Sequence, residues 1–175
     1  MYEQLLSVIG AEFPGFRVVR KSDSRFMKVL SFLLVVVTFG QMRLFMDGFT
    51  TTIGSTVYTP SLWEKMPDEE KCSILLHERV HLRQQKRYGR LLFGFLYLVV
   101  FFPLGLAYFR ARFEKEAYTE TMRSIKERHG AGVLYSKSLR QSIVRHFTSA
   151  EYGWMWPFKG AVERWYDDTV EKLNA

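Results

Sequence analysis

The chain has 175 residues, of which 47% are apolar and 16% aromatic, and it carries a formal net charge of +7 with an isoelectric point near 9.6. This apolar content excludes an intrinsically disordered protein, and the length suits one domain with a core of its own. The one cysteine, Cys72, excludes an internal disulfide framework. We therefore expect a buried thiol and a reducing, cytoplasmic environment.

The first elements predicted along the chain are a helix over 2–13, which Pro14-Gly15 ends, and a short strand over 16–20. No basic start is followed by an apolar run and a small-residue cleavage site, so no secretory signal is expected. Residues 27–39 are apolar but too few to span a bilayer, which needs about twenty. A buried helix or a helix-to-strand passage is predicted there.

A loose group of basic side chains runs through the same region, and no nucleic-acid motif accompanies it. We interpret the group as a solvated basic surface, with attraction to DNA or to a membrane as the alternative. Its members are Arg17, Arg20, Lys21, Arg25 and Lys28.

Residues 44–59 are rich in threonine and aromatic residues around Gly54-Ser55, a composition that predicts a β-hairpin. The hairpin directly precedes the helix described next. One of its arms could bind an extended peptide as an added strand, or the hairpin could be purely structural.

The segment from Pro67 to Gly89 has strong helix signals and contains the pattern H-E-x-x-H. Acidic residues stand at its start and basic residues near its end, where each favours the helix dipole. On this helix His77 and His81 project from one face, one turn apart, as two ligands of one zinc ion would. Glu78 can flank the metal without binding it, where a general base belongs.

A catalytic zinc site of this kind needs a third protein ligand, and the helix predicted around 112–120 supplies candidates. Glu114 shares its stripe with apolar residues and so points inward, whereas Glu116 shares a charged stripe that faces water. We therefore favour Glu114 over Glu116. His129 and His146 are further candidates, although a surface or capping role is the ordinary interpretation of either.

The combination of His77-Glu78-x-x-His81 with Glu114-Lys115-Glu116-Ala117 resembles the gluzincin metallopeptidases, in which a glutamate on a second helix completes the zinc site. The E-x-x-A spacing is similar to the E-x-x-A-D of membrane zinc proteases, but Tyr118 stands where those have aspartate. The resemblance covers about residues 42–125 and implies a minimal catalytic core with one catalytic Zn²⁺.

Residues 91–109 are nearly all apolar and long enough to be a transmembrane candidate. A single crossing would separate His81 from Glu114 across the bilayer, so the zinc site and a simple span exclude each other. Gly94, Pro103 and Gly105 offer breaks. We predict a buried helical hairpin, with a re-entrant or peripheral membrane contact as the alternative.

Beyond 131 we predict a helix and then an aromatic cluster at 152–158, leading into an amphipathic last helix. The cluster is typical of core closure. A phenol or imidazole near the zinc could instead stabilise the oxyanion that develops in peptide hydrolysis. Tyr118, His146 and Tyr152 are eligible, and Tyr118 is favoured because it lies one turn from Glu114.

Together these patterns predict one α+β domain over 1–175, a mainly helical zincin-like core at about 42–125 and a C-terminal helical segment at about 131–175. The predicted function is that of a cytoplasmic zinc metalloendopeptidase that acts on a protein or peptide, with membrane association as the alternative location. The alternatives are an inactive zinc-binding scaffold and a basic factor associated with DNA or membrane.

Overall fold

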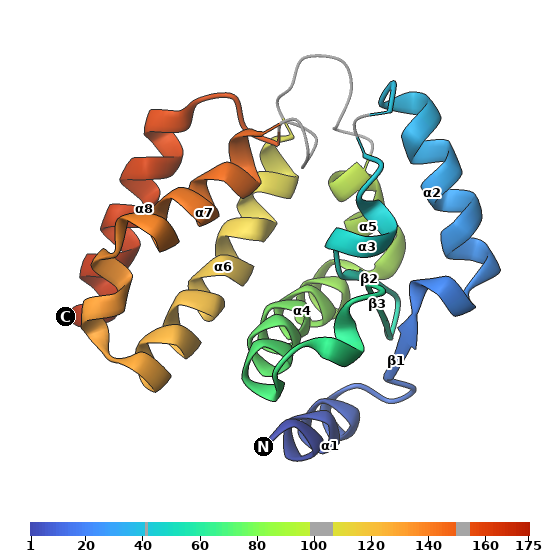
Figure 1. Ribbon diagram of the computed structural model, residues 1–175, viewed down its shortest axis with the longest axis horizontal. Coiled ribbons are helices and arrows are strands. Elements are labelled where there is room, and N and C mark those ends of the chain that lie inside the picture. Colours follow the sequence, from blue (N-terminus) through green and yellow to red (C-terminus); the bar gives the residue numbers. More distant parts are fainter. Residues whose placement is uncertain (41, 99–106, 150–154) are drawn as a thin grey trace. The chain divides into compact units, whose positions relative to one another are not determined.

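The computed structural model of the protein describes residues 1–40, 42–98, 107–149 and 155–175 (Figure 1). It is mainly helical with one small three-stranded sheet, which confirms the predicted α+β class. The chain divides into two compact units, Met1–Arg87 and Tyr88–Ala175. Each unit has its own core and is described by itself.

The first unit contains the sheet and ends with the helix that carries H-E-x-x-H. Its elements are α1 (Tyr2–Glu12), β1 (Arg17–Arg20), η1 (Lys21–Asp23), α2 (Arg25–Val37), α3 (Phe45–Gly48), β2 (Thr51–Ile53), β3 (Thr56–Thr59), η2 (Trp63–Lys65) and α4 (Asp68–Tyr88).

The sheet has the order β1-β3-β2, with β3 in the middle. β2 and β3 form the predicted hairpin, with Thr52 opposite Val57 in antiparallel register. β1 was predicted as a strand but not as a partner of this hairpin. It lies parallel to β3, with Val18 opposite Val57.

Helix α4 extends over the residues that its sequence signals predicted. The carbonyl of Pro67 accepts hydrogen bonds from the amides of Glu70 and Lys71 at the first turn. The helix ends before Gly89, whose φ of +80° is the left-handed conformation that glycine adopts readily. Local sequence therefore sets both ends of the helix that carries the candidate ligands.

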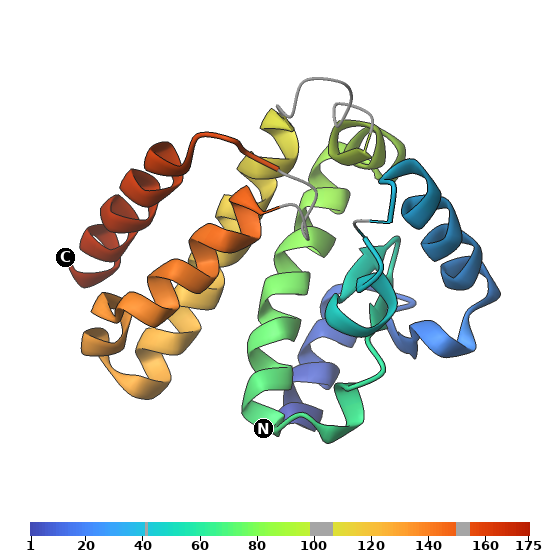
Figure 2. The same ribbon diagram turned by 45° about the horizontal axis from the view of Figure 1, so that its top comes forward.

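Helix α1 packs beside α4 (Figure 2). The core of this part of the unit brings Ile9 of α1 and Phe13, just after that helix, together with Leu75 and Leu82 of α4. At the surface, the carboxylate of Glu12 pairs with two guanidinium groups of α4, those of Arg79 and Arg83. These arginines hold the pKa of Glu12 below its ordinary value.

Helix α2 confirms the prediction of a helix over 27–39 but not the prediction that it is buried. The Ser24 hydroxyl caps its start by accepting from the Met27 amide at 3.2 Å. Met27 packs into a small core with Met42 and Phe45. The opposite side of the helix is exposed, and Phe32 there is 68% exposed. The apolar run therefore predicted the helix correctly but not its burial.

The second unit is helical. Its elements are α5 (Arg90–Leu98), α6 (Tyr108–His129), η4 (Ala131–Tyr135), α7 (Lys137–Thr148) and α8 (Lys159–Asn174). The described elements α6, α7 and α8 share one core, to which Met122, Phe147 and Val162 contribute. The buried phenol of Tyr166 on α8 donates to the carbonyl of Leu134 on η4 at 2.8 Å. Trp156 packs against this core, in agreement with the predicted core closure, whereas Tyr152 lies outside the described residues.

The apolar run 91–109 is described only in part. α5 covers its start, with Phe93 buried, and α6 begins at Tyr108. Pro103 and Gly105 lie outside the described residues, so the predicted hairpin stays a prediction. Within the part of the chain that the structure describes, no helix is both long and apolar enough to cross a membrane.

Candidate metal centre and catalytic residues

His77 and His81 lie on α4 within the first unit, one helical turn apart. Their ring centroids are 5.0 Å apart, and the ring planes are nearly perpendicular. His81 is buried and His77 is half-buried. The helix therefore presents two imidazoles on one face, as the four-residue spacing predicted.

A glutamine one turn further along α4 orients the His81 ring. The Nδ1 atom of His81 lies 2.9 Å from the side-chain oxygen of Gln84, which is also buried. An amide oxygen can only accept, so Nδ1 is the donor in this contact, and a neutral imidazole with its proton on Nδ1 offers the lone pair of Nε2 to a metal. Metal-binding histidines are held by hydrogen bonds of this kind at the second ring nitrogen. No pattern in the sequence distinguishes Gln84 from the other polar residues of α4.

Glu78 is buried and is held by the hairpin. The Thr52 hydroxyl on β2 donates to Oε2 of Glu78 at 2.6 Å. A second bond, from the Gly54 amide to the side-chain oxygen of Gln85, joins the hairpin turn to α4 at 2.9 Å. The proposed base therefore has a fixed position relative to strand β2. β2 lies at an edge of the sheet, where an added strand could pair, but its role in binding a peptide stays a prediction.

Lys21 corrects the prediction of a solvated basic cluster, because its side chain is only 1% exposed. Its ammonium donates to the carbonyls of Phe45 and Phe49 at 2.6 and 2.7 Å and lies 3.7 Å from the centre of the Phe45 ring. Burial lowers the pKa of Lys21 to about 7, although the negative charges of Glu78 and Asp47 act in the opposite direction. Lys21 thereby fixes the segment that enters β2. No pattern in the sequence separates it from its exposed basic neighbours.

Glu114 lies on α6 in the second unit and is 6% exposed, whereas Glu116 is exposed. The amphipathic pattern therefore predicted correctly which glutamate is buried.

The phenol of Tyr97 on α5 donates a hydrogen bond to Oε1 of Glu114. Burial and the charge of Glu114 raise the pKa of this phenol, so it stays a donor. The Arg110 guanidinium lies 5.3 Å from the centre of the Tyr97 ring. Tyr97 sits in an apolar run, where sequence gave no sign of a polar role.

Tyr118 lies one turn after Glu114 on α6, and its ring packs against the rings of His146 and Phe147, at 5.4 and 5.5 Å. Its role as an oxyanion donor stays a prediction. Nδ1 of His146 is 2.7 Å from the carbonyl of Ser142, an ordinary contact within a helix. His129 is exposed at the end of α6.

Comparisons of the chain with protein-family models, with curated proteins and with solved structures found no significant match. The resemblance to gluzincins therefore depends on the two short motifs alone and stays a prediction.

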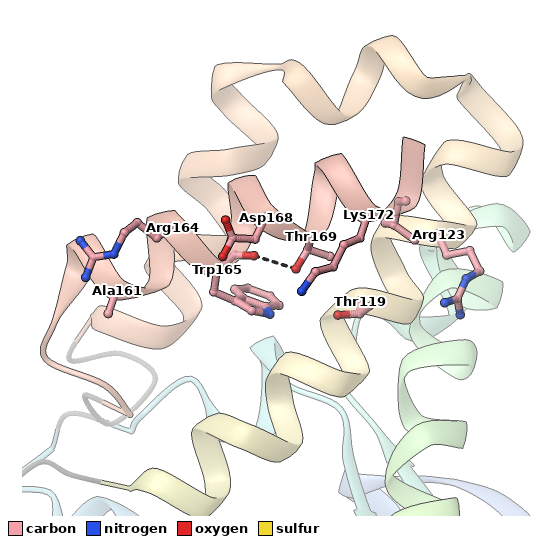
Figure 3. Close-up of a pocket in the computed structure, with 9 residues that line it drawn as sticks. Thr119, Arg123, Ala161, Arg164, Trp165, Asp168, Thr169 and Lys172 are labelled. Carbon is pink, nitrogen blue, oxygen red and sulfur yellow. Dashed lines mark hydrogen bonds between the residues drawn. The ribbon is translucent and has the colours of Figure 1, made fainter. Parts of the chain in front are cut away.

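An open groove of about 600 Å³ lies between α6 and α8 of the second unit (Figure 3). Thr119 and Arg123 of α6 face Trp165, Thr169 and Lys172 of α8 across it. None of the predicted catalytic or metal-binding residues lines this groove. Its lining mixes acidic and basic side chains, so it gives no sign of a particular ligand.

The side chains of the candidate centre fit a zinc ion. Two imidazoles and one carboxylate are a common donor set of catalytic zinc sites, which keep a further position open. His81 and Glu114 each have a hydrogen-bond partner of the kind that orients a metal ligand. A calcium or magnesium ion would favour a set made of oxygen atoms.

Proposed function

We propose that the protein is a zinc-dependent metallopeptidase in which His77, His81 and Glu114 hold one Zn²⁺ and Glu78 is the general base. The observation that carries the proposal is the buried carboxylate of Glu78, which the Thr52 hydroxyl holds on the helix that presents the His77 and His81 rings. A buried carboxylate with one hydroxyl partner is costly for stability alone, and such groups are concentrated at functional sites.

The third ligand is proposed from its own burial and its hydrogen bond within the second unit. Glu114 is 6% exposed, and its carboxylate accepts a hydrogen bond from the phenol of Tyr97. Glu116 is exposed. The proposal therefore keeps Glu114 and makes Glu116 its matched control.

The chemistry divides between the metal and the chain. A zinc ion, when bound, lowers the pKa of water towards about 7 and polarises a carbonyl group. The Glu78 carboxylate takes a proton from the attacking water while the oxygen of that water bonds to the carbonyl carbon of the peptide. The C–N bond then breaks, and Glu78 gives that proton to the leaving amine. The hydrogen bond from the Thr52 hydroxyl holds the Glu78 carboxylate in position during both proton transfers.

The substrate that suits this arrangement is a peptide in extended conformation. Strand β2 carries Thr52 and has an edge at which a peptide strand could pair by main-chain hydrogen bonds. The phenol of Tyr118 is the proposed donor to the oxyanion.

A reducing, cytoplasmic location agrees with a single buried cysteine, Cys72. Peripheral membrane contact through 91–109 is part of the same proposal.

The test measures zinc content and peptide cleavage in matched variants. We expect wild type to bind about one zinc and to digest a peptide library in a chelator-sensitive manner. Glu78→Gln should keep the zinc and lose turnover, because the amide cannot accept the proton. His77→Ala and Glu114→Ala should lose both, whereas Glu116→Ala should lose neither.

Three results would overturn parts of the proposal. Retained turnover in Glu78→Gln would refute the mechanism. Zinc binding without cleavage of any library peptide would favour a zinc-binding scaffold. If wild type binds no zinc in metal-replete buffer, the peptidase proposal fails, and salt-dependent binding to DNA would then be measured.

A further inference from the structure

Helix α2 presents an apolar surface to solvent in the first unit. We call this surface the α2 outer face. It consists of six large apolar side chains, each more than half exposed: Phe26, Val29, Phe32, Leu33, Val36 and Val37. Exposed apolar residues are normal when scattered singly, but a contiguous patch marks an interaction surface.

The other side of α2 already has a partner. Met27 is fully buried, and Leu30 and Leu34 pack against the same small core. The helix is therefore apolar on both sides, although only one side packs against other residues of the first unit. Neither burial nor solvation in the fold explains the composition of the outer face.

An exposed phenylalanine follows the helix. Phe39 has a φ of +51°, in the left-handed region that bulky side chains rarely adopt, and its side chain is 95% exposed. Gly40, which follows, also has a positive φ. This backbone forms the C-cap of α2, in which the amides of Phe39 and Gly40 donate to the carbonyls of Val36 and Val35 at 3.2 and 2.7 Å. Glycine usually occupies the left-handed position of such a cap, whereas here Phe39 occupies it and its ring is left in solvent.

Helix α2 and the segment that follows it as far as Arg43 carry only positively charged side chains. Arg25 and Lys28 lie in its first turn, and Arg43 follows Phe39 and Gly40. All three cations are exposed, and none forms an ion pair with another described residue. Helix α2 itself contains no acidic residue. The nearby Arg20 differs, because it pairs with Asp23 and Glu64.

We propose that the α2 outer face docks the protein on the surface of a bilayer that contains anionic phospholipid. A helix of 13 residues is about 20 Å long, too short to span a hydrocarbon core of about 30 Å. It lies in the interface instead, with apolar side chains and Phe39 inserted and with Arg25, Lys28 and Arg43 at the phosphates. A second copy of the chain is a poorer occupant, because it would bring the same unpaired cations together. The inference does not depend on the proposed peptidase activity.

The test is co-sedimentation of the full chain with vesicles of phosphatidylcholine, alone or with a quarter of phosphatidylglycerol. We expect binding to the anionic vesicles only, weakened by salt. The double variant Phe32→Gln/Phe39→Gln should bind about tenfold or more weakly, because each ring contributes inserted apolar area. The triple variant Arg25→Gln/Lys28→Gln/Arg43→Gln should lose about 100-fold, at roughly fivefold per charge. These side chains are exposed, so circular dichroism should be unchanged.

The matched control is Val8→Gln, which removes an exposed apolar side chain from α1 and should leave binding unchanged. Equal sedimentation of wild type and both variants would overturn the proposal. The proposal would also be overturned if the wild type did not bind vesicles. A wild type that is dimeric in solution, with a monomeric Phe32→Gln/Phe39→Gln variant, would overturn it too, since a second copy would then cover the face.

Discussion

Tyr97→Phe isolates one hydrogen bond to the proposed third zinc ligand. The change removes the hydroxyl that donates to Glu114 and keeps the ring, whose centroid is 5.4 Å from that of Phe93. A hydrogen bond to a charged group contributes about 1.5–3 kcal/mol. If that bond orients the ligand, its loss should weaken zinc binding by about 10- to 100-fold, as for other outer partners of metal ligands.

The assay is competition for zinc with a chromogenic chelator at neutral pH. Tyr108→Phe is the matched control, because this phenol is half exposed at the start of α6 and has no hydrogen bond to Glu114. We expect the control to bind zinc as wild type does. Unchanged zinc affinity in Tyr97→Phe would refute the reasoning, since either Tyr97 would not orient Glu114 or Glu114 would not bind the metal.

Three further predictions concern the first unit. Thr52→Val removes the donor to Glu78 at nearly constant shape, so we expect unchanged zinc content and about tenfold lower kcat in peptide cleavage. Gln84→Leu removes the acceptor for the His81 ring, so zinc affinity measured by chelator competition should fall by about 10- to 100-fold. Lys21→Met should destabilise the fold more at pH 9 than at pH 6. The pKa of Lys21 is about 7 when folded and about 10.4 when unfolded, so between these values the unfolded chain binds more protons and wild type gains stability as pH rises. Urea unfolding of both proteins at the two pH values measures the difference, at most about 1.4 kcal/mol per pH unit.

Two of these predictions have a neighbouring control. Thr51→Val lies on the same strand and should leave kcat unchanged, so an equal loss in both variants would point to the strand and not to the hydrogen bond. Lys28→Met removes an exposed amine and should show no dependence on pH. If the stability difference for Lys21→Met is the same at both pH values, Lys21 keeps its charge in the folded protein throughout.

Much of the local structure could be predicted because it depends on residues close in sequence. The ends of α4 follow from its charged turns and Gly89, and the hairpin follows from threonines around Gly54. The burial of Glu114 and the exposure of Glu116 follow from helical periodicity.

The features that sequence did not predict depend on contacts far along the chain. The parallel pairing of β1 with β3 joins segments that no local pattern relates. Lys21 looks like its basic neighbours until Phe45 and Phe49 supply carbonyls to it. The exposure of α2 was missed because an apolar run indicates that a surface will be covered, but not what covers it.

The order of the strands has a consequence for how the chain folds. β3 is the central strand but the last of the three to be synthesised. Arg17 on β1 can therefore form its ladder pair only after Thr56, 39 positions later in the chain, is available. Closing so long a loop costs entropy before any ladder bond forms, and this slows folding. Throughout that delay the loop contains α2, with neither apolar side yet covered. We expect refolding yield to fall as protein concentration rises and to recover when vesicles or a chaperone shield this helix.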